Sequence, residues 1–178
     1  MRGTQIYLRP LDQEDVHQSL RLQTDNRTFF EKYAVSREET FYTLKGQANL
    51  IAQKQLDAQK DEGYYFGIFT NTDDVLIGTI QLFHVNRGSL HKATMGYLLD
   101  KEHNGKGYTT EAVNLVVQYA FGDLDLHCIE AGAMPHNAGS LRVLEKSGFQ
   151  QAGLARKNVM IAGKWEEHIM LSIMKPQD

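Results

Sequence analysis

The stretch KEHNGKGYTTEA, residues 101–112, decides how the rest of the chain is organised. An alternating apolar run at 93–99 precedes it and an amphipathic helical pattern at 113–121 follows it, which predicts a strand, a glycine turn and a helix start. Gly105 and Gly107 allow consecutive backbone N–H groups to point at one spot, and the helix N-terminus adds partial positive charge. The turn therefore predicts a binding site for a phosphate or pyrophosphate.

Length and composition favour a single domain over residues 1–178, because 42% hydrophobic residues can fill one substantial core. The formal net charge of −3, with both signs interspersed, argues against direct nucleic-acid binding. No apolar stretch approaches the roughly 20 residues that cross a bilayer, and the N-terminus lacks the apolar core of a signal peptide. We therefore expect a cytoplasmic protein without membrane attachment. The single cysteine, Cys128, is expected to be a packed small hydrophobe rather than a nucleophile.

Periodicity and turn residues predict the element order strand, two helices, three strands, helix, strand, helix and two strands. The strands are expected at residues 5–8, 64–69, 75–84, 93–99, 128–134, 151–161 and 164–174. The helices are expected at 13–23 after an Asp12 cap, at 36–60 after a capping box formed by Ser36 and Glu39, at 107–121, and at 137–146 after an Asn137 cap. In the second helix, the apolar positions at helical spacing are Phe41, Leu44, Ala48, Ile51, Ala52 and Leu56.

The fold class follows from the connections between these elements. The strands at 64–69, 75–84 and 93–99 leave no room for crossovers and predict an antiparallel meander. The strand at 128–134 follows a helix and should run parallel to 93–99. This gives an α/β fold with a mixed, mostly antiparallel sheet. The segment 24–35 is both polar and aromatic, and is predicted to be a loop that either lines a binding surface or packs its rings onto the core.

The glycine turn alone is a weak signal. It lacks the third glycine of a dinucleotide fingerprint and the Gly-Lys-Ser/Thr of a mononucleotide loop. A second motif strengthens it: Asn137-Ala-Gly-Ser140, then Leu-Glu-Lys at 144–146 and Ser-Gly-Phe at 147–149. There Gly148 can take the left-handed position that ends the helix.

Together these residues resemble the GNAT family of acyl-CoA-dependent N-acetyltransferases, and within it the branch of ribosomal-protein N-terminal acetyltransferases (RimJ/RimL-like). The matching residues are Gly96-Tyr97, the turn at 105–112, and the run from Asn137 to Phe149. The resemblance implies a GNAT-like fold of about seven strands and about four helices, with a V-shaped splay between the two central parallel strands. Glu102 departs from the Gln or Arg that is frequent in the family, so backbone amides must carry pyrophosphate binding.

The resemblance further implies acetyl-CoA as the cosubstrate, with its pyrophosphate on the glycine turn and its pantetheine arm in the splay. A backbone N–H near Leu98 or Leu99 would stabilise the oxyanion, and Asn137 would cap its helix, bind the pantetheine amide, or both. The residues expected to bind the cosubstrate are Leu98, Leu99, His103, Asn104, Gly105, Lys106, Gly107, Tyr108, Thr109, Asn137 and Ser140.

The catalytic residues are predicted less firmly. Many relatives carry a tyrosine where this chain has Leu144, so Ser140 is the candidate that protonates the departing thiolate; the alternative is a serine that bonds only backbone. The general base is open: His84, Glu130 and Glu167 could each assist, and each could instead have a surface or packing role. A spacing such as His-Glu-x-x-His does not occur, so no catalytic metal is expected.

By resemblance, direct acetyl transfer to a primary amine is the predicted reaction, and a protein N-terminus, such as that of a ribosomal protein, is the leading acceptor. The alternatives are a small amine such as a polyamine or aminoglycoside, and a CoA-binding sensor without turnover. The acceptor should be held by residues 24–35, the second helix and the turn at 161–165, and an acidic cleft would favour a cationic acceptor. Many family members are dimers, which leaves a homodimer open.

Overall fold

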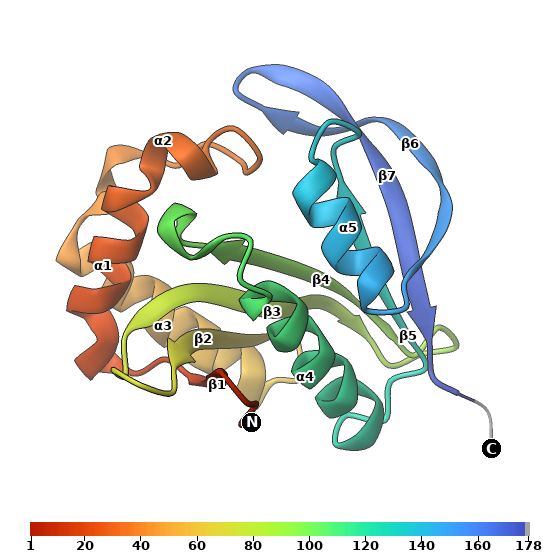
Figure 1. Cartoon of the computed structure of the whole chain (residues 1–178), viewed down its shortest axis with the longest axis horizontal. Helices are drawn as coiled ribbons and strands as arrows, with labels where there is room; N and C mark the ends of the chain where they lie inside the picture. Colours follow the sequence, from red (N-terminus) through yellow and green to blue (C-terminus); the bar gives the residue numbers. More distant parts are fainter. Residues whose placement is uncertain (177–178) are drawn as a thin grey trace.

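The computed structural model describes residues 1–176, in which seven strands form one sheet in the order β1-β2-β3-β4-β5-β7-β6 (Figure 1). The strands are β1 (Ile6–Pro10), β2 (Tyr64–Thr70), β3 (Leu76–Asn86), β4 (Lys92–Leu99), β5 (Cys128–Ala133), β6 (Gln150–Ile161) and β7 (Lys164–Met174). Neighbouring strands are antiparallel except β4 and β5, which are parallel. The predicted mixed, mostly antiparallel sheet is confirmed.

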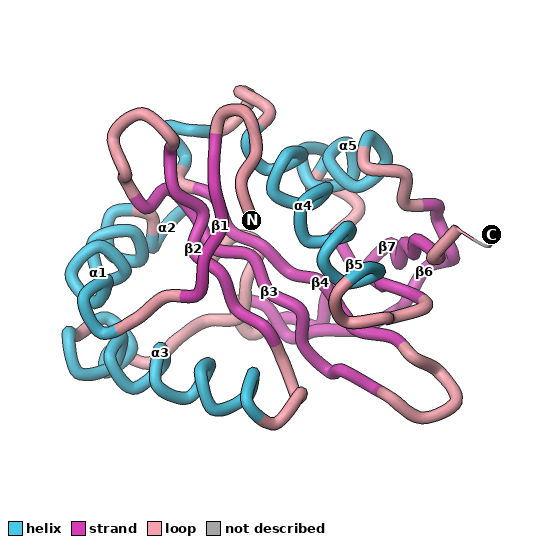
Figure 2. The backbone as a smooth tube through the Cα atoms, turned by 90° about the horizontal axis from the view of Figure 1, so that it is seen from below, coloured by secondary structure: helices cyan, strands magenta, loops and turns pink. Residues whose placement is uncertain are grey.

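Helices cover both faces of the sheet (Figure 2). They are α1 (Val16–Asp25), α2 (Arg27–Phe30), α3 (Leu44–Gln59), α4 (Tyr108–Gly122) and α5 (Ala138–Lys146), with 3-10 turns at Gln13–Asp15, Glu39–Tyr42 and Lys101–His103. One apolar cluster fills the space between the sheet and α4, and a second lies under α1 and α3. Within residues 1–176, no helix is long and apolar enough to cross a membrane.

The segment 24–35, predicted to be a loop, contains the short helix α2. Asn26, at the junction of α1 and α2, is only 1% exposed. Its side-chain amide donates to the carbonyl of Leu22 at 3.1 Å and accepts from the N–H of Lys101 at 2.9 Å. Because this side chain joins α1 to the segment beside the glycine turn, a contact across 75 residues of sequence helps to hold the region in a compact helical form.

The second long helix starts later than predicted. α3 begins at Leu44, where the Thr43 hydroxyl accepts from the N–H of Gly46 at 3.0 Å. The expected capping box at Ser36 and Glu39 does not form, because the Glu39 carboxylate instead accepts two hydrogen bonds from Arg27, at 2.5 and 3.0 Å. A charge-assisted bidentate pair with α2 therefore replaces the local cap.

The buried face of α3 also differs from the predicted one. Leu44 and Leu56 are 44% and 45% exposed, whereas Ile51 and the polar Gln47 are buried. Gln47 accepts a hydrogen bond from the hydroxyl of Ser19 in α1 at 2.7 Å, and both side chains are fully buried. A polar pair between α1 and α3 thus determines which side of α3 faces inward, and apolar periodicity could not reveal it.

The parallel strands β4 and β5 separate beyond their first four pairs. Their register runs from Lys92 opposite Cys128 to Met95 opposite Ala131. After that, β4 remains paired with β3 as far as Leu99, while β5 remains paired with β7. Figure 1 shows the two strands diverging. The predicted splay is confirmed, and it leaves backbone groups of both strands without a strand partner on the inner side.

Candidate active site

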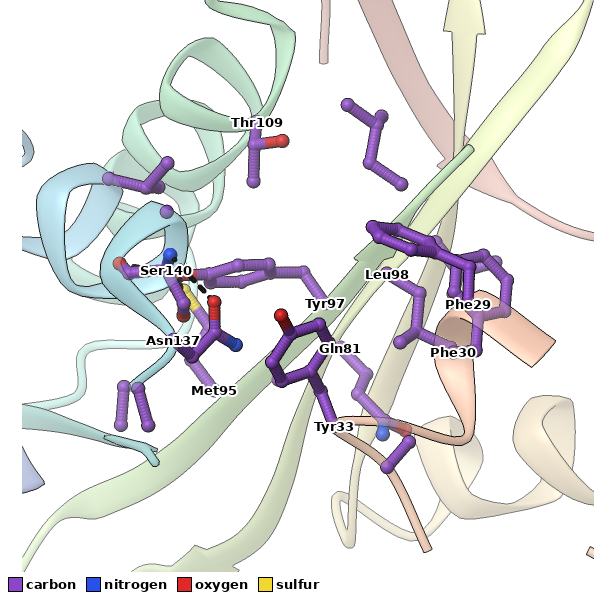
Figure 3. Close-up of a pocket in the computed structure, with 18 of the residues that line it drawn as sticks. Phe29, Phe30, Tyr33, Gln81, Met95, Tyr97, Leu98, Thr109, Asn137 and Ser140 are labelled. Carbon is purple, nitrogen blue, oxygen red and sulfur yellow. Dashed lines mark hydrogen bonds between the residues drawn. The ribbon is translucent and has the colours of Figure 1, made fainter. Parts of the chain in front are cut away.

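A cavity of about 980 Å³ lies where β4 and β5 diverge. Its lining includes β4 beyond Met95, β5 from Ala131 onward, the starts of α4 and α5, and residues of α2 and α3. Residues from both faces of the sheet take part: Tyr97 and Ser140 on the α5 side, and Gln81 and Leu98 on the opposite side (Figure 3). The cavity therefore connects two surfaces of the molecule through the splay, with room for two reactants that meet in the middle.

The glycine turn forms one end of this cavity. Gly105 and Gly107 have φ values of 77° and 85°, and a Cβ at either position would meet no heavy atom within 4 Å. Glycine is therefore required here by the backbone conformation and not by lack of space. Gly107 is the N-cap of α4 and supplies no capping side chain. The first N–H groups of α4 thus have no intrahelical partner and can bind an anion.

Most residues predicted to bind the cosubstrate line the cavity. They are Leu98, Leu99, His103, Asn104, Gly105, Gly107, Tyr108, Thr109, Asn137 and Ser140. Lys106 is the exception: its side chain is exposed and does not contribute to the lining. Glu102, whose charge would repel a pyrophosphate, is also exposed and outside the lining. The turn therefore presents backbone to the cavity and directs this carboxylate away from it.

Ser140, Asn137 and Tyr97 form a connected cluster on the α5 side (Figure 3). Asn137 caps α5 as predicted, with its side-chain oxygen accepting from the N–H of Ser140 at 3.2 Å. The Ser140 hydroxyl lies 2.8 Å from the hydroxyl of Tyr97 on β4. Burial raises the pKa of Tyr97 to about 12, although the hydrogen bond with Ser140 opposes this shift. Tyr97 therefore keeps its proton near neutral pH and can donate it to Ser140.

The three candidate general bases do not join this cluster. His84 is exposed at an irregularity of β3, and Glu167 is exposed on β7. Glu130 accepts from the ammonium of Lys92 at 2.9 and 3.0 Å, on the part of β5 that is still paired with β4. None of the three contributes to the cavity lining within residues 1–176. A role for any of the three as general base stays a prediction, which the lining of the cavity does not support.

The opposite end of the cavity is aromatic. Phe29 and Phe30 of α2 lie across from Asn137 and Ser140, and Tyr33 reaches toward Asn137 (Figure 3), with its ring 6.1 Å from that of His136. Further lining residues outside the glycine turn and α5 include Phe41, Leu50, Lys54, Tyr65, Thr79, Gln81, Phe83, Val159, Ile161 and His168. The segment 24–35 and the second helix therefore contribute to the lining, as predicted, while the turn at 161–165 contributes only Ile161.

The charges around the cavity are mainly positive. Among the lining residues of the described chain, Glu31 is the only carboxylate. It is already engaged, since it accepts from the Nε of Arg27 at 3.1 Å and from the Tyr42 hydroxyl at 3.3 Å. The lining cations are Arg37, Lys54, Arg142 and Lys146. The described lining of the cavity therefore offers no free carboxylate to a polycation.

Two lining residues with titratable groups were missed by sequence reasoning. Tyr97 belonged to a quoted motif, but its hydroxyl received no role; alternation along β4 would have indicated that it shares a face with Met95. His168, on β7, is buried and lines the cavity, and only the pairing of β7 with β5 reveals its position. Within residues 1–176, no group of three or more His, Cys, Asp or Glu side chains is arranged to hold a metal ion.

Two residues outside the cavity lining have structural roles, and for Cys128 this role was predicted. Cys128 is 6% exposed and lies outside the cavity lining. Burial raises the pKa of its thiol, which suits a packed small hydrophobe. The Glu111 carboxylate, in the first turn of α4, accepts from the Thr4 hydroxyl at 3.0 Å and from the N–H of Gln5 at 3.2 Å. It ties the N-terminal segment to α4.

Comparison with known proteins adds relatives along the whole chain. Residues 5–150 match the family described as the acetyltransferase (GNAT) domain. The chain is 54% identical over 178 residues to "Probable N-acetyltransferase YjcK" of Bacillus subtilis (strain 168), covering 100% of this chain and 98% of that protein. It is 31% identical over 153 residues to the ribosomal protein uS5-alanine N-acetyltransferase of Escherichia coli (strain K12), covering 85% and 78%.

The fold has close structural relatives as well. The crystal structure of the ribosomal-protein-S5-alanine acetyltransferase from Vibrio fischeri matches this chain with a TM-score of 0.94 at 28% sequence identity. The match covers 99% of this chain and 97% of that one.

Proposed function

Because the chain belongs to the GNAT acetyltransferase family, we propose that it transfers the acetyl group of acetyl-CoA to the α-amine of a protein N-terminus, with a ribosomal protein as the leading acceptor. Relatives named for acetylation of a ribosomal-protein alanine support this acceptor class. The observation that carries the proposal is the charge of the cavity, whose one lining carboxylate is already engaged.

The residues at the glycine turn fit the donor. The free N–H groups at the start of α4 suit the pyrophosphate of acetyl-CoA. The unpaired inner edges of β4 and β5 suit the amides of its pantetheine arm, which can hydrogen-bond like an added strand. This arrangement would bring the thioester to the level of Leu98 and Leu99, where a backbone N–H can stabilise the oxyanion.

The Tyr97 and Ser140 pair supplies the proton for the leaving group. The acceptor nitrogen attacks the acetyl carbon, the new C–N bond forms, and the C–S bond breaks. Ser140 donates its hydroxyl proton to the departing sulfur and recovers one from Tyr97 across the 2.8 Å contact. Tyr97 is then reprotonated from solvent, and the proton lost by the attacking nitrogen is released to solvent. No covalent enzyme intermediate is needed.

The charge of the acceptor side favours a protein α-amine over a polyamine or an aminoglycoside. An α-amine has a pKa of roughly 7.7 to 8.0, so an appreciable fraction is neutral near pH 7 and needs no carboxylate to hold it. A polyamine carries several positive charges and would meet Arg37 and Lys54 without a free carboxylate on the lining. The aromatic rings of α2 can instead pack against the side chains that follow the terminal amine.

The test is a CoA-release assay with acetyl-CoA and a panel of peptides, spermidine and an aminoglycoside. We expect turnover with N-terminal peptides, and a large loss of kcat in Ser140→Ala. Ser147→Ala is the matched control, since Ser147 ends the same helix and lies outside the cavity lining. Turnover with spermidine alone would overturn the acceptor class. Tight acetyl-CoA binding without turnover on any amine would indicate the sensor alternative.

The cellular acceptor can be found by mass spectrometry. Protein N-termini are compared between cells with and without the gene, and a ribosomal protein that loses N-terminal acetylation would identify the acceptor. An unchanged set of acetylated N-termini, with small amines acetylated instead, would contradict the proposal.

A further inference from the structure

A buried histidine lines the acceptor side of the cavity without a partner. His168, on β7, is 8% exposed, and its Nδ1 is buried with no hydrogen bond within residues 1–176. Its ring lies against Gly132 of β5, where an added Cβ would be 3.6 Å from the His168 Cδ2. Nε2 is not among the buried side-chain atoms without a partner, so of the two ring nitrogens it is the one left to face the cavity.

The strand registers give the height of His168 along the splay. The last pair between β4 and β5 joins Met95 to Ala131, and β5 continues beside β7 until Ala133 is opposite Ile169. Because β5 and β7 are antiparallel, His168, the residue before Ile169, lies opposite the third residue after Ala131. Leu98 is the third residue beyond Met95. His168 and Leu98 therefore lie at the same height on the two sides of the splay, where the acetyl group is expected.

The alternation of side chains along each strand shows on which face of the sheet His168 lies. Leu171 of β7 and Met95 of β4 belong to the apolar cluster under α4. His168 is three residues from Leu171, and Leu98 is three residues from Met95, so both point to the opposite face of the sheet. Ser140 lies on the α5 side. His168 and Ser140 therefore approach the splay from opposite faces.

From this geometry we infer that His168 is the proton acceptor for the attacking amine. The inference rests on the proposed acetyl transfer. The amine attacks the reacting carbon from one direction and the sulfur departs in another, so a base on one face and an acid on the other match the two proton transfers. As the C–N bond forms, the ammonium proton passes to the His168 ring, directly or through one water, and then to solvent, while Ser140 protonates the sulfur. Imidazole is the side chain whose charge changes near neutral pH.

The carboxylates near this ring are already paired, and β6, which pairs with β7, carries the cations Arg156 and Lys157 in the bulge beside His168. Glu166, two residues earlier on the same face of β7, lies 3.4 Å from Lys164. Glu130, on the same face of β5, is held by Lys92. Across the cavity are the engaged Glu31 and the cations of Arg37 and Lys54, together with the phenols of Tyr33 and Tyr65. None of these carboxylates is free to take the role of His168.

The test compares pH profiles of kcat/KM for the wild type, His168→Gln and His17→Gln, with whichever amine of the panel turns over fastest. His17 is exposed on α1 and outside the cavity lining, which makes it the matched control. We expect His168→Gln to lower kcat/KM about 100-fold near neutral pH, with the loss shrinking as pH rises and the amine deprotonates on its own. The affinity for acetyl-CoA should not change. Wild-type-like activity, or an equal loss at every pH, would overturn the inference.

A second measurement needs no variant. The wild type is assayed with two acceptors whose amines differ in pKa. If a group of the enzyme accepts the proton, the acidic limb of kcat/KM stays in place when the amine pKa changes. A limb that moves fully with the amine pKa overturns the inference. Since any productive amine serves in both assays, failure of peptides as acceptors would count against the proposed function and leave this test intact.

Discussion

The glycine turn allows a quantitative test of how backbone conformation supports donor binding. In Gly107→Ala, the new Cβ would meet no heavy atom within 4 Å, and the backbone has a φ of 85°. The substitution therefore neither loses nor gains packing, and its cost is the left-handed conformation alone. For an L-residue that cost is about 1–2 kcal/mol.

This cost divides between two measurable quantities. If the turn keeps its shape in the free protein, the full cost appears as a lower free energy of unfolding. If the turn relaxes, stability recovers, but acetyl-CoA must restore the left-handed form and binds more weakly. In either case the loss of unfolding free energy and the loss of acetyl-CoA binding free energy add to about 1–2 kcal/mol.

Urea unfolding gives the first quantity and titration calorimetry with acetyl-CoA gives the second. Gly122→Ala is the matched control, since Gly122 ends α4 with an ordinary φ and equally open space. It corrects for the stability that any Gly→Ala change gains because alanine lowers the conformational entropy of the unfolded chain. Relative to that control, a summed loss near zero would refute the claim that Gly107 is required by its backbone conformation.

Three further predictions concern side chains. Tyr97→Phe removes the hydroxyl 2.8 Å from Ser140 and should lower kcat about threefold to tenfold with unchanged acetyl-CoA affinity; a fall in affinity alone would contradict the proton-supply role. Glu111→Ala frees the N-terminal segment from α4 and should reduce the unfolding free energy by about 1 kcal/mol with kcat intact, as measured by urea unfolding and the CoA-release assay. The Asp61 carboxyl has its pKa lowered from 3.8, chiefly by the hydrogen bond from Arg87, so its stabilisation is full above pH 3.8 and is lost as pH falls through the lower folded-state pKa. Asp61→Asn should therefore be less stable than the wild type at pH 7, with the difference shrinking in acid; a constant difference in urea unfolding would contradict this.

Features that depend on neighbours in sequence were predictable. The Asp12 and Asn137 caps and the two glycines of the turn follow from contacts within a few residues, and the structure confirms them. The parallel pairing of β4 and β5 followed from the helix between them. The family resemblance, which rested on the turn and the run to Phe149, is confirmed by the relatives.

What the sequence by itself determined is thus the element order, the sheet type and the conformation of the glycine turn, because hydrogen-bond periodicity and glycine dihedral angles are local. Tertiary structure alone decided the start of α3, through the Arg27 pair with Glu39, and the acid–base geometry of the cavity. Tyr97 meets Ser140 across 43 residues, and His168 reaches the level of Leu98 only through two strand registers. Proton transfer depends on distances between groups far apart in the chain, and those distances exist only once the sheet has formed.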